Sequence, residues 1–215
     1  MEITLDTIEV RILGSLMEKE MATPEYYPLS LNALIAACNQ KTSRFPVLTL
    51  NEKDVLNALQ SLKEKYLVYQ SDASRVPKYW HDFFKKNNLI RREAALFCLL
   101  LLRGPQTAGE LRSRTERLCS FENLEEVNQY LENLSEIGLV SKLPRQPGRK
   151  EQRFAHLLAG NPEGINEEVA CQEPNLICQE TVVDRIADLE DSVVYLKNEI
   201  EVLKNELSSL KKDRH

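Results

Sequence analysis

Apolar residues follow one spacing in two stretches of the chain, residues 55–68 and 127–140. The shared signature is Val-x3-Leu-x2-Leu-x4-Leu-Val, with the second copy 72 residues after the first: Val55, Leu59, Leu62, Leu67, Val68 and Val127, Leu131, Leu134, Leu139, Val140. The spacing predicts an amphipathic helix that runs into a short strand. Self-similarity at a constant, domain-sized offset indicates that one structural unit was duplicated.

The elements around the first copy follow from capping signals and apolar spacing. Helical spacing covers residues 5–21, where Asp6-x-x-Glu9 is a capping box. Ser30 is expected to cap a helix over residues 31–38, and a polar loop follows over 40–47. Asn51 and Asp54 are suited to begin the helix of the signature, and strands are expected at 67–69 and 76–80.

The elements around the second copy come in the same order. An apolar helix over 90–103 ends at Gly104, and Thr107-x-x-Glu110 predicts a second helix that runs through Leu118. Asn123 is expected to cap the third helix, and Gly138 to end it. Strands are predicted at 139–143 and 152–157, on either side of a turn.

Three helices followed by a hairpin is the order of a winged-helix module. The predicted fold is therefore mainly α with small β-hairpins (α+β), with winged-helix domains at residues 1–84 and 89–159. Residues 160–181 are acidic and rich in turn residues, which is typical of a linker.

Residues 182–212 are predicted to form a coiled-coil helix. Apolar residues recur there with heptad spacing, at position a (Ile186, Val193, Ile200, Leu207) and position d (Leu189, Leu196, Leu203, Leu210). β-Branched residues at a with leucine at d favour a parallel dimer, and three of the flanking g–e pairs have opposite charge. We therefore expect a homodimer through these residues; pairing with another protein, or packing on the chain's own domains, stays open.

Four long motifs resemble the YceH family of uncharacterised bacterial proteins. They are TPEYYPLSLNAL at residues 23–34, ACNQKTSRFPV at 37–47, LRGPQTAGELRSR at 102–114 and LPRQPGRKE at 143–151. The resemblance covers residues 5–158. It implies tandem winged-helix domains and implies no activity.

The distribution of charge bears on nucleic-acid binding. The chain has a net charge of −5, yet residues 83–160 hold 13 Lys/Arg against 9 Asp/Glu. The candidate contacts are cations on loops, a helix and the second wing, with two amides on the first signature helix: Lys41, Arg44, Asn57, Gln60, Arg112, Arg114, Lys142, Arg145, Arg149, Lys150 and Arg153. The second signature helix has four glutamates and no Lys or Arg, which opposes phosphate contact. The first hypothesis is that the chain binds duplex DNA as a transcriptional regulator. The alternative is a protein-interaction scaffold that does not bind DNA.

Other classes find little support. The three histidines fit no metal or catalytic spacing, no Gly-rich phosphate loop is present, and neither catalysis, a metal nor a cofactor is expected. The five cysteines contain no C-x2-C pair and are expected to be reduced structural thiols. No apolar run is long enough to cross a bilayer and no export signal begins the chain, so a cytoplasmic bacterial protein is predicted.

Overall fold

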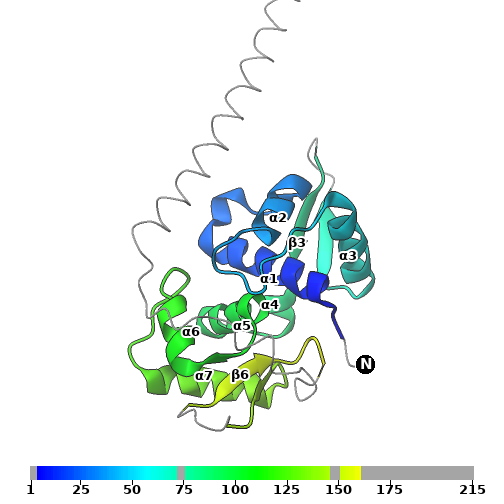
Figure 1. Cartoon of the computed structure of the whole chain (residues 1–215). Helices are drawn as coiled ribbons and strands as arrows, with labels where there is room; N and C mark the ends of the chain where they lie inside the picture. The colour runs from blue at the N-terminus through cyan, green and yellow to red at the C-terminus, as the bar shows by residue number, and fades with distance from the viewer. Residues whose placement is uncertain (1–3, 72–75, 146–150, 161–215) are drawn as a thin grey trace, which may run out of the picture. The chain divides into compact units, whose positions relative to one another are not determined.

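Helices make up most of the regular structure in a computed structural model, which describes residues 4–71, 76–145 and 151–160 (Figure 1). Two small antiparallel sheets accompany them, so the fold is α+β and mainly helical. The predicted coiled coil at 182–212 and the linker beyond Gly160 lie outside the described residues. Arg149 and Lys150 of the second wing lie outside them too.

Among its described residues, the first half of the chain has five helices and one sheet. In chain order its elements are α1 (Thr7–Ala22), the 3-10 helix η1 (Pro24–Tyr26), β1 (Leu29–Ser30), α2 (Leu31–Cys38), α3 (Glu52–Glu64), β2 (Val68–Ser71), β3 (Lys78–His81) and α4 (Phe83–Lys86). The strand order is β1-β3-β2, with Val68 opposite His81 and Leu29 opposite Tyr79.

The second half repeats this plan. Its elements are α5 (Arg91–Arg103), β4 (Gln106–Thr107), α6 (Ala108–Arg114), α7 (Leu124–Glu136), β5 (Val140–Lys142) and β6 (Arg153–His156). The strand order is β4-β6-β5, with Val140 opposite His156 and Gln106 opposite Phe154. Each half thus has three long or medium helices, with a two-residue strand before the second helix and a hairpin after the third.

The helix caps confirm most of the predicted boundaries. Asp6, Asn51 and Thr107 each accept a backbone N–H at the start of α1, α3 and α6 in complete capping boxes. The signature helices end in matching ways: Leu67 N donates to Leu62 O (2.9 Å), and Leu139 N donates to Leu134 O (3.0 Å). These bonds close both helices one residue before the strand.

Three features differ from the prediction. The first strand of each sheet, β1 and β4, was not expected, because two residues carry no readable periodicity. The helix predicted from Thr107 through Leu118 is shorter, and α6 ends at Arg114; buried Leu118 follows it in a turn. The short helices η1 and α4 were also not predicted.

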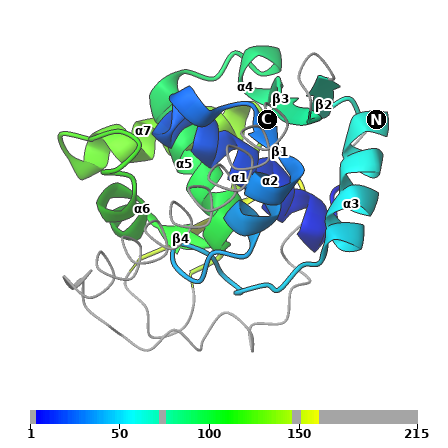
Figure 2. The ribbon, with the colours of Figure 1, turned by 90° about the horizontal axis from the view of Figure 1, so that it is seen from above.

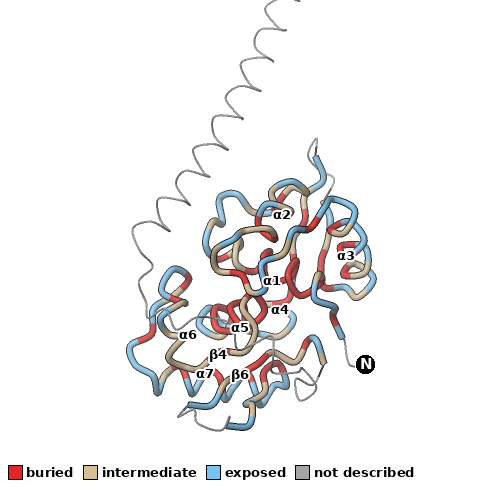
Figure 3. Tube along the Cα trace, in the orientation of Figure 1, coloured by how far each residue is buried: buried red, intermediate tan, exposed pale blue. Residues whose placement is uncertain are grey.

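All ten apolar residues of the repeated signature are buried. They belong to one continuous apolar cluster that spans both halves, and α1 and α5 pack against each other at its centre (Figures 2 and 3). Gly14 permits this packing, because a Cβ atom there would lie 2.9 Å from Leu102 Cδ2 and 3.1 Å from Leu101 Cβ. The halves are therefore joined through a shared helical interface rather than through a spacer.

Candidate nucleic-acid interface

The third helices of the two halves, α3 and α7, present equivalent outer faces with different charge. Three residues of α3 that project from its exposed side, Lys53, Asn57 and Gln60, are matched 72 residues later by Glu125, Gln129 and Glu132. All six are exposed. The duplicated helix has therefore kept its buried face in both copies, whereas two of these three exposed positions are negative in the second copy only.

The sequence folds α3 so that this face points outward. Val55, Leu59 and Leu62 are buried on the opposite side, since spacings of three and four residues place them on one stripe. Gln60 Nε2 donates to Glu64 Oε1 at 2.9 Å along the exposed side. Lys63 Nζ donates to Gln70 Oε1 on β2 at 3.1 Å, which ties the end of the helix to the hairpin.

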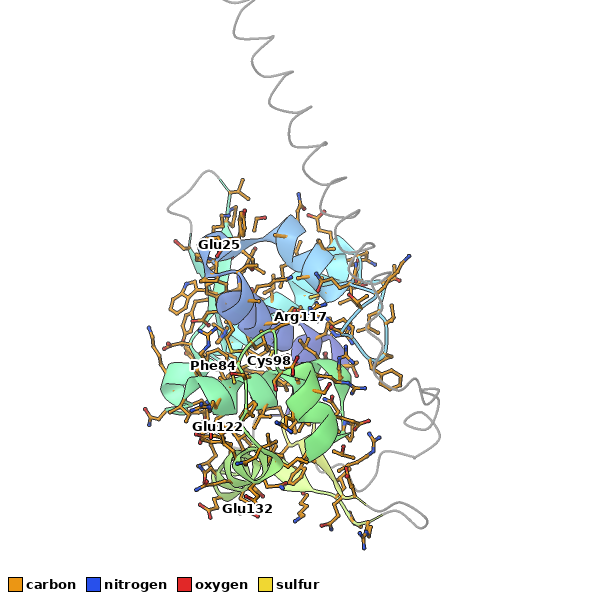
Figure 4. All side chains as sticks on the ribbon, turned by 90° about the vertical axis from the view of Figure 1, so that its left-hand side faces the viewer. Glu25, Phe84, Cys98, Arg117, Glu122 and Glu132 are labelled. Carbon is orange, nitrogen blue, oxygen red and sulfur yellow. The ribbon has the colours of Figure 1, made fainter. Side chains whose placement is uncertain are left out.

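The outer face of α7 is acidic. Glu125, Glu132 and Glu136 are exposed, whereas Glu126 is paired with Arg92 Nε at 3.0 Å. Figure 4 shows Glu132 at the end of the described structure remote from Glu25 of the first half. A phosphate backbone laid on α7 would meet like charges, which repel it.

Arg44 lies in the interior and is not a surface cation. Its side chain is 0 % exposed and forms an ion pair with Glu18 of α1. The same guanidinium donates to Ala37 O (Nε 3.2 Å, Nη2 3.0 Å) and to Gln40 Oε1 (3.0 Å). Its five N–H donors are used to hold the loop after α2 to α1, which removes Arg44 from the residues that can reach a nucleic acid in this structure.

The loop after α2 is built around a second buried arginine and one asparagine. Arg11 donates to Cys38 O (3.1 Å) and to Pro46 O (2.6 Å), and burial together with the nearby Arg44 lowers its pKa to about 10. The amide of Asn39 exchanges two 2.8 Å hydrogen bonds with the backbone of Leu50. Asn39 and Gln40, whose roles the sequence leaves open, therefore stabilise the loop, and the neighbouring Lys41 is exposed.

Three of the predicted contacts in the second half make structural hydrogen bonds. Arg112 donates to the backbone oxygens of Phe121 and Glu122, and Arg114 Nη1 donates to Gln106 Oε1 (2.7 Å). Arg153 donates to Pro105 O (2.6 Å) and pairs with Glu110 (3.2 Å). These bonds hold α6 to its neighbouring strands and loop, so they limit how freely the three guanidiniums can turn toward a ligand.

Two cations of the second wing are exposed. Lys142 places its ammonium 5.8 Å from the ring centre of Phe154, and Arg145 follows β5. Both residues belong to the second half of the chain, whereas α3 belongs to the first half. The structure thus brings Asn57 and Gln60 together on one face with Lys53, a residue that the sequence analysis did not select and that the comparison of copies identifies.

The described residues contain neither a helix suited to crossing a bilayer nor a cluster of three metal-ligating side chains. Cys38 and Cys98 are buried and have free thiols. Burial raises the pKa of Cys38 to about 11, so this thiol stays protonated at neutral pH.

Known proteins share this sequence over nearly all the described residues. A family model described as "Protein of unknown function, DUF480" matches residues 5–149. The chain belongs to the DUF480 family. A relative from Solibacter usitatus, called a UPF0502 protein, is 57% identical over 171 residues, which cover 79% of this chain and 82% of the relative. A UPF0502 protein of Geobacter sulfurreducens is 51% identical over 194 residues, covering 88% and 89% of the two chains.

This membership confirms the resemblance on which the family expectation was based. The DUF480 match includes the motifs at residues 23–34, 37–47 and 102–114. In the structure, the second motif forms the end of α2 and the loop that Arg44 holds, and the third runs from the end of α5 into α6. These two motifs therefore contain residues that hold the fold together.

Proposed function

We propose that the chain is a tandem winged-helix protein that binds duplex DNA through α3, in the cytoplasm and in transcription regulation. Each half has the element order of a winged-helix module, whose third helix enters the major groove. The observation that carries the proposal is the charge difference between α3 and α7 at equivalent exposed positions. The three positions Lys53, Asn57 and Gln60 carry no acid, whereas the matched positions of α7 carry two glutamates that repel phosphates.

The chemistry of the α3 face suits base and backbone contact. Asn57 and Gln60 carry amides, which pair with the N6 and N7 edge of adenine in the major groove. Lys53 lies one turn earlier and supplies a flexible ammonium for a phosphate. Lys63, bonded to Gln70, and Lys78 on β3 supply two more cations toward the hairpin. Exposed Lys41 adds a cation in the loop before α3.

The experiment is a binding titration against random duplex DNA across a salt series, read by fluorescence anisotropy. Each phosphate that a cation neutralises steepens the fall of log affinity with log salt by about 0.9. A protein that makes about three or four such contacts therefore weakens steeply as salt rises. No binding to a random or genomic duplex at low salt, by protein with an intact circular dichroism spectrum, would overturn the proposal.

A second candidate function follows from α7. Its exposed acids lie between two exposed apolar residues, Leu124 (43% exposed) and Ile137 (54% exposed), at the two ends of the helix. Apolar anchors with surrounding charge are typical of protein interfaces. A scaffold role, in which α7 holds a basic protein partner, is therefore the alternative, and it is preferred if the DNA titration fails.

Dimerisation through residues 182–212 belongs to the same proposal. A dimer with two-fold symmetry presents one module from each subunit to each of two half-sites on DNA. The heptad pattern supports this assembly. Deleting residues 182–215 is expected to halve the mass measured by sedimentation equilibrium, and an unchanged mass would reject these residues as the dimer contact.

A further inference from the structure

A cavity of about 370 Å³ lies in the first half, where the end of α1, the strand β3 and the helix α4 meet. Tyr27, Trp80 and Phe84 supply aromatic surface, and Glu20 and Asp82 supply carboxylates. Its volume is within the range of small-molecule sites, which combine apolar walls with a few polar groups. Figure 4 labels Phe84 on α4 at the left edge of the view.

A histidine and a carboxylate that contact each other line this cavity. His81 has a side chain only 1% exposed, and its Nδ1 accepts from the backbone N–H of Phe83 at 3.1 Å. Glu20 Oε2 pairs with His81 Nε2 at 2.7 Å, and the side chain of Glu20 is 38% exposed. An ionised carboxylate has two oxygens with about four acceptor sites, so Glu20 can accept from a ligand in addition to contacting His81.

The charge of the cavity favours a cation. Glu20 and Asp82 are opposed by one ammonium, that of Lys85. Tyr27 adds no negative charge, because burial raises its pKa and its hydroxyl oxygen accepts from the backbone N–H of His81 at 2.8 Å. Aromatic faces next to carboxylates stabilise an organic cation through both cation–π and ionic contact.

The second copy of the fold lacks this arrangement. His81 and His156 occupy the same register, opposite Val68 and Val140, so Trp80 is matched by Ala155. Glu9 and Glu93 occupy the same capping position in α1 and α5, and this offset of 84 residues matches Glu20 with Gly104. The duplicated unit therefore folds without the tryptophan and without the carboxylate.

We propose that this cavity binds a small organic amine as its ammonium ion, independently of DNA. The N–H donors of the ammonium bind the carboxylate of Glu20, and the apolar body of the ligand lies against Trp80 and Phe84. Asp82 contributes long-range attraction, since it lines the same cavity.

Trp80 is the only tryptophan of the chain, so its fluorescence reports on this cavity directly. The full chain is titrated with benzylammonium, and in parallel with benzyl alcohol, which has nearly the same shape and no charge. A saturable change in Trp80 fluorescence is expected with benzylammonium. The affinity for benzyl alcohol is expected to be lower by about tenfold or more, because a charge-assisted hydrogen bond is missing. Equal affinity for the two probes, or no saturable change with benzylammonium, would overturn the proposal.

Two variants locate the binding. Glu20→Gln keeps the shape of the side chain and is expected to weaken benzylammonium binding about tenfold. Glu25→Gln is the matched control, because Glu25 is exposed on η1 and does not line the cavity. Equal affinities for the two variants would reject Glu20 as the ammonium contact. Nα-acetyl-lysinamide presents a lysine side chain on a peptide-like body, and tighter binding of it than of benzylammonium would overturn a small amine as the ligand in favour of a lysine of a protein.

Discussion

The thiol of Cys98 donates to the carbonyl oxygen of Gly14 at 3.5 Å, where α1 crosses α5. The two residues are 84 positions apart, which is also the spacing of Glu9 and Glu93 at the capping positions of these helices. Equivalent positions of the two copies thus meet at the interface between them. Cys98 belongs to the apolar cluster that spans both units.

Substituting Gly14 tests how closely these helices must approach. A valine at this position would place atoms against Leu101 and Leu102, since Cβ alone reaches within 2.9 Å of Leu102. We expect Gly14→Val to lower the free energy of unfolding by about 1–3 kcal/mol, as overpacking does. Gly109→Val on α6 is the control, because the nearest atoms to its Cβ are 3.8 Å away, and it is expected to change stability by only about 0.5 kcal/mol. Urea unfolding of both variants measures the difference, and equal losses would contradict a close helix crossing.

Tyr66 and Gly138 occupy the same position after the two signature helices. Both have left-handed backbone, with φ of 57° at Tyr66 and 75° at Gly138. A non-glycine residue pays about 1 kcal/mol for this conformation. We therefore expect Tyr66→Gly to be about 1 kcal/mol more stable than Tyr66→Ala, which removes the same exposed side chain without relieving the backbone. Chemical unfolding compares the two variants, and a more stable Tyr66→Ala would show that φ at this position does not carry the cost.

Arg44 distinguishes a structural cation from a DNA contact. Removal of its buried guanidinium leaves Glu18 and Ala37 O without their donors. We expect Arg44→Ala to lower the free energy of unfolding by about 3 kcal/mol or more. Lys41→Ala, at an exposed position three residues earlier, is expected to stay within about 0.5 kcal/mol of wild type. Thermal unfolding gives both values; an Arg44→Ala protein with wild-type stability would refute the structural role.

His156 makes stability depend on pH. Burial lowers its pKa from the ordinary value of 6.5 to about 4. The unfolded chain therefore binds a proton in this window that the folded chain does not, so stability falls as pH decreases from about 6.5 to about 4. The His156→Gln variant is expected to lose less stability than wild type between pH 7 and pH 4.5, by about 1–2 kcal/mol. Urea titrations at several pH values give the two slopes, and parallel slopes would contradict a half-buried histidine that stays neutral in the folded chain.

Much of this fold can be predicted from the sequence because its signals are local. The capping boxes at Asp6 and Thr107 and the buried stripe through Leu59 and Leu131 depend only on neighbours within a helix. The same reasoning could not place Arg44, because an arginine in a polar loop usually faces solvent, and Glu18 approaches it only in the folded chain.

The limits of sequence reasoning are also visible in Gly14 and in the α3 face. A glycine inside an amphipathic helix does not reveal that a second helix crosses there. Lys53 becomes informative only when its position is matched with that of Glu125 and both are seen to be exposed. Charge on a helix surface is otherwise typical of ordinary solvated residues.

The most direct test of the account exchanges the surfaces of the two third helices. Lys53→Glu with Gln60→Glu gives α3 the residues that α7 has at these positions, and Glu125→Lys with Glu132→Gln makes the reverse change. DNA affinity at low salt is measured for both variants and for wild type. The account predicts about a tenfold or greater loss for the α3 variant and no loss for the α7 variant. Unchanged affinity of the α3 variant, in a protein that binds DNA, would contradict it.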